Sequence, residues 1–498
     1  MSNPSHPKDS HPQPDYSRKW LAMAAVAMGV FLGTIDGSII NVSLPTLMEA
    51  LNTDFPTIQW IILGYLLTIT SLLLSVGRLA DIQGKKKIYQ LGFVIFILGS
   101  MLCGFSPSAG WLVTFRILQA VGASMVTALG AGIITAAFPP HERGKALGIM
   151  GTIVSVGIAT GPALGGLLIG TIGWRAIFFV NVPVGIIGVI MVRAFVSTDT
   201  PIGRQRFDLI GAGTLLVSLL SLLLALTLGQ RLGFDSSLVL ALLLNFVLFL
   251  AIFLFVERKV VQPMVNLTMF HNPLFSFSLL TGFLAFVAMG GNFILPFYLQ
   301  DVQGYRAIQV GLLLSVLPLM LSVTAPLSGA LSDRFGTRGL ATAGLFLMAI
   351  SFMLLSTLRV DTSILGYILR IAPLGIGIGL FQSPNNSAIM GTVSRDRLGI
   401  ASGFLAITRT LGQTTGVAVI GTIFAARAAT HAGQTISANL DATSAAALVR
   451  GLQEAMVIVG IMMFLATLIS AVGLWKKWES EPVGKSQQAH GVAPQEPT

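Results

Sequence analysis

The sequence is poor in charge and in cysteine. Only 10% of its 498 residues are charged, whereas 54% are hydrophobic and the mean hydropathy is +0.82. Soluble proteins carry charge on roughly a quarter of their residues, so these values exclude a soluble globular class and indicate a polytopic membrane protein. Cys103 is the only cysteine, which makes an intrachain disulfide impossible.

The signatures of several enzyme classes are missing as well. There is no Gly-x4-Gly-Lys-Ser/Thr string that would bind ATP. The glycine-rich segment 375–379 lies inside an apolar run with no strand before it, so it is not a nucleotide loop. Neither a metal-ligand cluster nor a nucleophile-base constellation is visible. We therefore expect no enzyme activity, no metal and no cofactor.

The net charge of +10 does not indicate a nucleic-acid partner. The basic residues fall in short segments between apolar runs instead of gathering in one patch. Such a distribution is typical of a chain that is oriented in a lipid bilayer.

Apolar runs long enough to cross a bilayer recur along the whole chain, at about 20 residues for each helical span. We predict fourteen spans, at residues 20–44, 57–78, 87–106, 110–138, 144–170, 175–196, 208–229, 237–256, 272–300, 308–331, 338–358, 362–390, 398–426 and 452–475.

The basic residues predict the orientation of these spans. Of the 30 Lys and Arg residues, 21 fall on the side of the N-terminal tail, six fall on the opposite side, and Arg116, Arg370 and Arg409 fall inside spans. Because cytoplasmic loops are enriched in Lys and Arg, both termini are expected in the cytoplasm of a bacterial-type inner membrane. Residues 1–19 are expected to be a disordered cytoplasmic tail and residues 476–498 a second cytoplasmic tail.

An internal repeat divides the chain into two related halves. Residues 77–84 reappear at 329–336, and Arg116 matches Arg370 with an offset of 254 residues. We predict six-helix bundles at 20–196 and 272–475, a linker with two extra spans at 197–271, and an outer loop at 427–451. Transporters built from such repeats bind substrate near the membrane midplane, between the halves.

The first span carries a carboxylate, Asp36. It is the only one of the 20 acidic residues that we place deep in a span. A charged group at the bilayer centre costs roughly 2.5 to 3.5 kcal/mol, so Asp36 is either a satisfied structural group or a proton-titrating group on a transport pathway. Counting 1.5 Å per residue, Arg116 lies within about one helical turn of the same depth. A guanidinium there would favour the ionised carboxylate, although a purely structural Arg116 fits the sequence too.

Three motifs now support a comparison with a known family. The chain resembles the major facilitator superfamily, and within it the fourteen-spanner drug:proton antiporters of the EmrB/QacA type. The first motif resembles the signature loop between spans two and three and consists of Gly77, Arg78, Asp81 and Gly84. Gly84 permits a tight reversal there. Asp333 and Arg334 keep the pattern in the second half, whereas Ile82 replaces the usual Arg in the first.

The second motif, Arg116-x-x-Gln119-x-x-Gly122, resembles a fourth-span motif whose arginine takes part in proton coupling. The third lies in the fifth span and resembles the motif that marks exporters within the superfamily. It consists of Gly157, Gly161, Pro162, Gly165 and Gly166. The proline is expected to kink the helix, and the glycines to offer a smooth face to another helix.

The resemblance implies an all-α major facilitator fold, with two six-helix bundles related by a pseudo-twofold axis and two extra helices between them. It implies alternating access and the exchange of protons, as coupling ion, for an amphipathic drug-like substrate. Asp36 and Arg116 would couple the proton. The polar residues expected to line the substrate cavity, each of which also suits a role in holding helices together, are Asn41, Tyr65, Gln119, Asn181, Gln382, Asn385 and Gln413.

Other functions remain open at this point. A dedicated exporter of one native metabolite or antibiotic would share every motif, and an uptake symporter is disfavoured by the fifth-span motif. A sensor without transport activity is disfavoured by the short loops and tails. Three arginines against one aspartate inside the spans disfavour a dication and favour monocationic, neutral or weakly anionic substrates. We expect no nucleic-acid partner, and the sequence does not specify a periplasmic or accessory one.

Overall fold

A computed structural model describes residues 17–139, 142–197, 209–233, 235–260, 267–393, 398–432 and 444–475 of the protein. In these ranges every regular element is a helix, and twelve candidate spans are long and apolar enough to cross a membrane. Two further long helices are α8 (Leu209–Leu232), which packs mainly on α9 (Ser237–Lys259), and α16 (Leu398–His431), which packs on α10 (Pro273–Gly290), α17 (Ala445–Trp475) and α2 (Phe55–Gln83). The predicted all-α class is confirmed, and the helical passes agree with the fourteen predicted spans.

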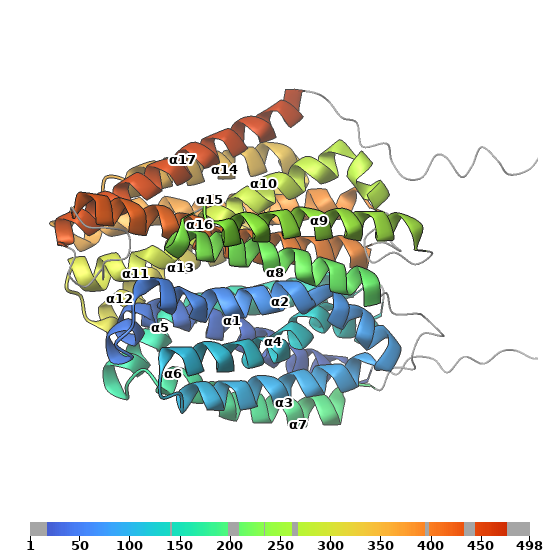
Figure 1. The fold of residues 1–498 in the computed structure, drawn as a ribbon. Coiled ribbons are helices and arrows are strands. Elements are labelled where there is room, and N and C mark those ends of the chain that lie inside the picture. The colour runs from blue at the N-terminus through green and yellow to red at the C-terminus, as the bar shows by residue number, and fades with distance from the viewer. Residues whose placement is uncertain are drawn as a thin grey trace, which may run out of the picture.

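The N-terminal half forms one bundle (Figure 1). Its closest helix pairs are α3 with α4, α1 with α5 and α2 with α4. Its helices are α1 (Lys19–Ala50), α2 (Phe55–Gln83), α3 (Lys85–Gly104), α4 (Ala109–Ala137), α5 (Arg143–Thr171), α6 (Ala176–Phe179) and α7 (Asn181–Phe195).

The C-terminal half forms the second bundle and is more broken (Figure 1). The predicted span 272–300 consists of several consecutive elements, and so does the span 308–331. The elements of this half are η1 (Leu267–His271), α10 (Pro273–Gly290), η2 (Gly291–Ile294), α11 (Leu295–Phe297), the π-helical η3 (Tyr298–Val302), α12 (Ala307–Leu314), α13 (Val316–Phe335), α14 (Thr337–Leu355), α15 (Ile364–Gly391), α16 and α17 (Ala445–Trp475).

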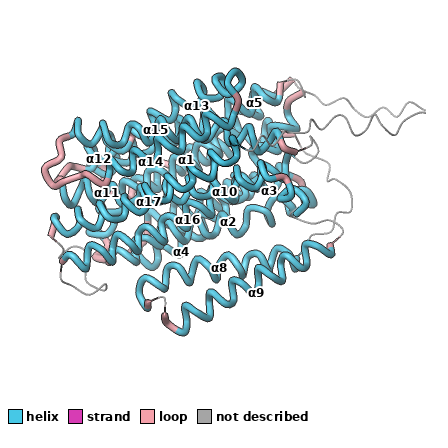
Figure 2. The backbone as a smooth tube through the Cα atoms, turned by 90° about the horizontal axis from the view of Figure 1, so that it is seen from above, coloured by secondary structure: helices cyan, strands magenta, loops and turns pink. Residues whose placement is uncertain are grey.

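Two helices lie outside both bundles. Figure 2 shows α8 and α9 (Ser237–Lys259) side by side along the outside of the molecule. The Asn245 amide donates a 2.7 Å hydrogen bond to the Ser221 hydroxyl and so links the pair. Large apolar side chains of α9 are exposed, including Leu244 at 70%. A helix that is apolar on its outer face suits contact with lipid.

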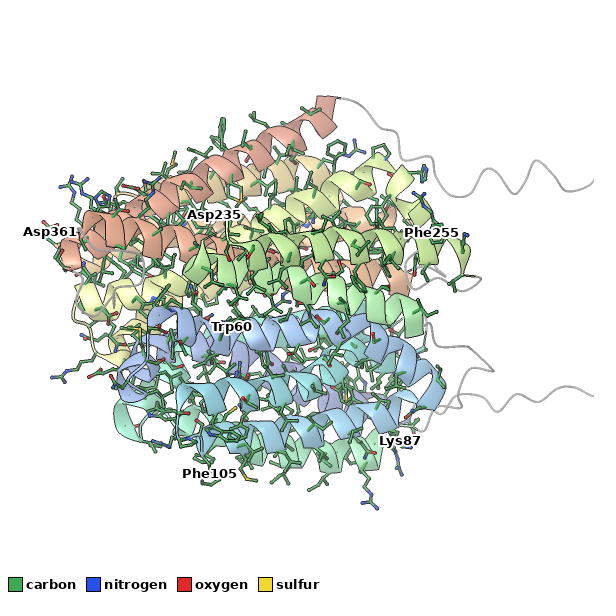
Figure 3. All side chains as sticks on the ribbon, viewed as in Figure 1. Trp60, Lys87, Phe105, Asp235, Phe255 and Asp361 are labelled. Atoms are coloured by element: carbon green, nitrogen blue, oxygen red, sulfur yellow. The ribbon has the colours of Figure 1, made fainter. Side chains whose placement is uncertain are left out.

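The two ends of the helical bundles differ in their chain connections. We call the end at which α1 begins and α17 ends the tail face, and the other end the loop face (Figure 1). Figure 3 shows Lys87 toward the tail face and Asp361 at the loop face. The fold therefore places both described ends of the chain on one side, as an even number of passes requires.

Glycine makes the same tight reversal in both halves. Gly84 joins α2 to α3 with φ of 95°, and Gly336 joins α13 to α14 with φ of 84°. This backbone region is accessible to glycine at little cost. Gly77 lies in α2, one turn before Asp81. The side chains of Arg78, Asp81, Asp333 and Arg334 lie outside the described part, so their pairing remains a prediction.

The helices extend into the predicted outer loop 427–451. α16 continues to His431 and α17 begins at Ala445, while residues 433–443 lie outside the described residues. Glu454 of α17 joins the two helices through Arg427, with 3.2 Å between Oε2 and Nε, and through His431, with 2.6 Å between Oε1 and Nε2. Several alanines occupy these helix ends, and alanine favours helix.

Candidate functional site

A cavity of about 620 Å³ lies between the two bundles. Four helices of the N-terminal half line it (α1, α2, α4 and α5), together with α10, α13, α15 and α16 of the C-terminal half. Its size falls in the range of about 300 to 1,000 Å³ that is typical of sites for drug-sized molecules. The position between the repeats is the one that the sequence predicts.

Close packing between the halves seals the cavity on the loop face. A methyl group added at Gly311 of α12 would collide with the carbonyl oxygen of Pro162, and one at Gly166 with the carbonyl oxygen of Ala307. The fifth-span motif thus meets α12 backbone against backbone. On the same face the Gln300 amide donates to the Thr46 hydroxyl at 3.3 Å.

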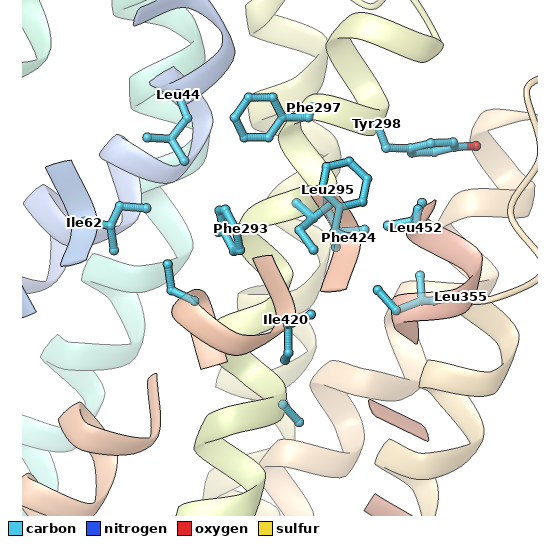
Figure 4. Close-up of a cluster of buried hydrophobic side chains, with 14 of the residues drawn as sticks. Leu44, Ile62, Phe293, Leu295, Phe297, Tyr298, Leu355, Ile420, Phe424 and Leu452 are labelled. Carbon is cyan, nitrogen blue, oxygen red and sulfur yellow. The ribbon is translucent and has the colours of Figure 1, made fainter. Parts of the chain in front are cut away.

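An aromatic cluster adds to this seal. The ring of Phe55, at the start of α2, lies 5.0 Å from Phe297, 5.6 Å from Phe424 and 5.8 Å from Phe293. Figure 4 shows Leu44 and Ile62 of the N-terminal half facing Phe293 and other apolar side chains of the C-terminal half. Water is excluded from this part of the interface because all of these residues are buried.

The cavity extends in the other direction, toward the tail face. Thr127, Gly130 and Ala131 line it from the second half of α4, and Met150 and Gly151 line it from the first turns of α5. Gly151 is exposed. The described conformation is therefore closed toward the loop face and reaches toward the tail face.

Asp36 lies beside this cavity and is held by three side chains. Arg116 Nη1 donates to Asp36 Oδ2 at 2.6 Å, and the amides of Gln119 and Asn181 each donate to Oδ1 at 2.9 Å. The carboxylate and the guanidinium are each 1% exposed. α4 supplies Arg116 and Gln119 from adjacent turns of one face, and α7 supplies Asn181 at its first residue.

A second set of contacts orients these donors. Arg116 Nη1 also donates to Gln119 Oε1 at 2.7 Å, which fixes the amide so that its nitrogen points to Asp36. The Asn181 amide also donates to Ser100, whose hydroxyl donates to the Phe178 carbonyl at 2.8 Å. Sequence reasoning did not identify Ser100, because its role depends on the rotation of α3 about its axis.

Arg116 and Tyr65 separate Asp36 from the cavity. The guanidinium lies 4.0 Å above the centre of the Tyr65 ring. Both residues line the cavity, whereas Asp36 does not. A buried ion pair is costly to desolvate and is strongly disrupted when one partner loses its charge. Loss of the charge on Asp36 would therefore leave Arg116 buried without its ionic partner.

The structure separates the predicted cavity residues into two groups. Asn41, Tyr65, Gln382 and Gln413 line the cavity. Gln119 and Asn181 are instead fully buried donors to Asp36. Asn385 is 6% exposed, lies near Gly282 of α10, and is not part of the cavity wall.

The fifth-span motif has two packing faces. Gly157 and Gly161 contact α1 of the same half, where added methyl groups would collide with Thr34 and Ser38, and Gly165 packs on Ile39. Pro162 and Gly166 contact α12 of the other half. Most of the motif therefore fixes α5 to the helix that carries Asp36, and only part of it serves the interface between the halves.

Three polar residues of the cavity wall were not predicted as site residues. Arg409 lines the cavity from α16. Tyr367 and Asn292 line it too, and within the described part of the chain the Tyr367 hydroxyl and Asn292 Oδ1 are buried without a hydrogen-bond partner. Arg409 was predicted to lie inside a span, and its spacing of four residues from Gln413 indicated that the two share one helix face.

Comparison with known proteins agrees with this geometry. The sequence profile of the Major Facilitator Superfamily matches residues 26–208 and 208–417. The chain is 35% identical over 410 residues to the riboflavin transporter RibZ of Clostridioides difficile, covering 82% of this chain and 89% of that protein. It is 32% identical to the multidrug resistance protein Stp of Mycobacterium tuberculosis, covering 82% and 76%.

A solved structure shares the fold. The crystal structure of a bacterial homologue of the human lysosomal transporter Spinster, in an inward-facing and unoccupied conformation, has a TM-score of 0.65 at 18% identity, covering 93% of this chain and 99% of that chain. Together with the profile match, the repeat and the central cavity, this likeness identifies the chain as a multi-pass membrane protein that belongs to the major facilitator superfamily of transporters.

Proposed function

We propose that the protein exports amphipathic drug-like molecules across the bacterial cytoplasmic membrane in exchange for protons. The observation that carries the proposal is the buried Asp36–Arg116 pair beside a drug-sized cavity between the repeats. The excess of Lys and Arg on the tail-face side supports a cytoplasmic location of that face. The described conformation is then the one that receives substrate from the cytoplasm.

The ion pair gives the exchange a physical basis. While Asp36 is ionised, Arg116, Gln119 and Asn181 join α1, α4 and α7 around it. A proton that reaches Asp36 from the outer side removes the charge that holds Arg116. The packing within the N-terminal bundle then changes. This change shifts the equilibrium of the two bundles toward the conformation that is open on one face. Release of the proton to the cytoplasm restores the pair, and each proton supplies about 2.3 kcal/mol per 100 mV.

The direction of coupling is testable in proteoliposomes. We expect a lumen more acidic than the outside to drive accumulation of dyes with unrelated scaffolds, because protons that leave the lumen exchange for dye that enters. A symporter gives the reverse dependence and accumulates dye only when the outside is more acidic. Both expected dependences on the pH gradient hold for either orientation of the protein in the vesicle membrane. Accumulation driven by an acidic exterior would therefore overturn the proposed antiport.

A second candidate is export of one compound. It is favoured by the relative named as a riboflavin transporter, whose sequence covers most of this chain. Riboflavin is fluorescent and belongs in the same assay. Transport of riboflavin with no transport of any other dye would favour this narrow function, whereas transport of several unrelated scaffolds would exclude it.

A further inference from the structure

One cationic side chain in the cavity is not used by the proposed proton coupling. Arg409 lies on the face of α16 that also presents Ala406, Gln413 and Val417 to the cavity. These positions follow the helical repeat, so a single stripe of α16 forms part of the wall. Gln413 stands one turn from Arg409, at a spacing that brings the two side chains to the same region.

Arg409 differs from Arg116 because it has no carboxylate partner among the described residues. Arg116 is paired with Asp36, whereas no acidic side chain contacts Arg409 among the residues that the structure describes. The two arginines are the only charged residues among the described lining of the cavity. With Arg116 neutralised by Asp36, the cavity retains one positive charge, which comes from the C-terminal half.

An unpaired guanidinium in a mainly apolar wall is costly to bury and attracts an anion. Its five donors match a carboxylate or another planar acid better than a neutral group. The neighbouring wall is apolar and aromatic, with Phe286, Met289 and Phe293. The same half supplies the Tyr367 hydroxyl and Asn292 Oδ1, both buried and unpartnered in the described ranges. The C-terminal wall thus offers unpartnered polar groups in addition to Arg409.

We propose that Arg409, with Gln413 beside it, forms a binding subsite for the acidic group of the exported molecule. The substrate class is an amphipathic aromatic compound with a carboxylate or an equally acidic oxygen. The acid would pair with Arg409 while the ring system packs on the apolar wall. This inference deepens the proposed export function by naming its substrate class, and it assigns substrate charge to the C-terminal half and proton coupling to the N-terminal half.

A matched pair of dyes tests the subsite without any transport. Rhodamine 110 carries a free carboxylate, and rhodamine 123 is its methyl ester. We expect purified protein in neutral detergent to bind the acid at least about tenfold more tightly than the ester, measured by fluorescence anisotropy, since a hydrogen bond to a charged partner contributes that much. Arg409→Gln should abolish the preference, and Arg409→Lys should keep part of it.

Arg370→Gln is the control, because Arg370 lies outside the cavity lining and contacts Thr357 and Gly366. It should bind both dyes like the wild type. The proposal is overturned if the wild type shows no preference for the acid, including no binding of it at millimolar concentration, or if Arg409→Gln keeps the preference.

An anionic lipid headgroup would offer the same chemistry. The titration is therefore repeated with phosphatidylglycerol in the micelles. Unchanged binding of the acid supports a soluble substrate. Complete displacement of the acid by the lipid would overturn the assignment of the subsite to a soluble substrate and favour a lipid headgroup. Binding in detergent needs no proton gradient, so this inference and the proposed antiport can fail separately.

Discussion

The two halves of the molecule use equivalent positions for different purposes. In the N-terminal half, Arg116 is 1% exposed and pairs with Asp36. Its repeat counterpart Arg370 is partly buried and donates to the Thr357 hydroxyl at 2.9 Å and to the Gly366 carbonyl at 2.8 Å. One arginine pairs with a buried carboxylate, and the other donates to neutral oxygen atoms.

The position equivalent to Asp36 explains the difference. An offset of 254 residues leads from Asp36 to Gly290, which packs against the backbone of α16 at Gln413 and Gly416. The C-terminal half therefore has a helix crossing where the N-terminal half has a carboxylate. A duplicated fold has kept its packing scheme, while among the described residues only the N-terminal copy carries a buried carboxylate–arginine pair.

The largest expected effect is a difference in stability between variants of the two arginines. Removal of one partner of a buried ion pair costs about 3 to 5 kcal/mol, because the other charge remains buried. We therefore expect Arg116→Gln to lower thermal stability in detergent strongly, and Arg370→Gln to lower it little, since its partners are neutral and partly exposed. The double variant Asp36→Asn/Arg116→Gln should recover part of the loss. Equal losses for the two single variants would contradict the comparison.

The next largest expected effect is a difference in stability between alanine variants of two glycines. A methyl group at Gly290 would meet the Gln413 carbonyl oxygen, and we expect Gly290→Ala to cost about 1 to 3 kcal/mol through overpacking. Gly37, next to Asp36, has open space around it. Gly37→Ala should therefore be neutral, or stabilising by about 0.5 to 1 kcal/mol through lower chain entropy. Thermal unfolding in detergent ranks the two variants, and the reverse order would refute the assignment of Gly290 to a helix crossing.

The smallest expected effect is a difference in transport rate between alanine variants of two buried serines. Ser100 bonds the Phe178 carbonyl and accepts from Asn181, whereas Ser351 bonds only the Arg370 carbonyl at 2.6 Å in the described contacts. Each change to alanine should cost about 1 kcal/mol of stability. We expect Ser100→Ala alone to reduce the initial rate of proton-driven transport as well. A transport defect of the same size in Ser351→Ala would show that the serines act only through stability.

Much of the fold could be predicted because membrane spans are defined by length, hydropathy and flanking charge, all of which are local. The depth of Asp36 and Arg116 followed from the rise of a helix, and the structure brings them into contact. What the sequence could not supply is the rotation of each helix about its axis. Gln119 and Asn181 were predicted in the cavity wall and lie behind it, on Asp36, while Arg409 faces the cavity.

The breaks in the C-terminal half were missed for a related reason. η2, α11 and η3 interrupt the predicted span 272–300 after Gly290, where Gly291 and Pro296 weaken the helical pattern. Hydropathy does not register such breaks, because most residues of this stretch remain apolar and buried. Tertiary packing against α16 and α17 stabilises the irregular backbone.

In the proposed function, the Asp36 carboxylate couples protons to transport. Wild type and Asp36→Asn should be compared at equal reconstituted amounts, in proteoliposomes with and without an acidic lumen. We expect the variant to equilibrate dye down its own gradient but no longer to accumulate dye in response to the proton gradient. Accumulation by Asp36→Asn at the wild-type level would show that Asp36 does not couple protons to transport.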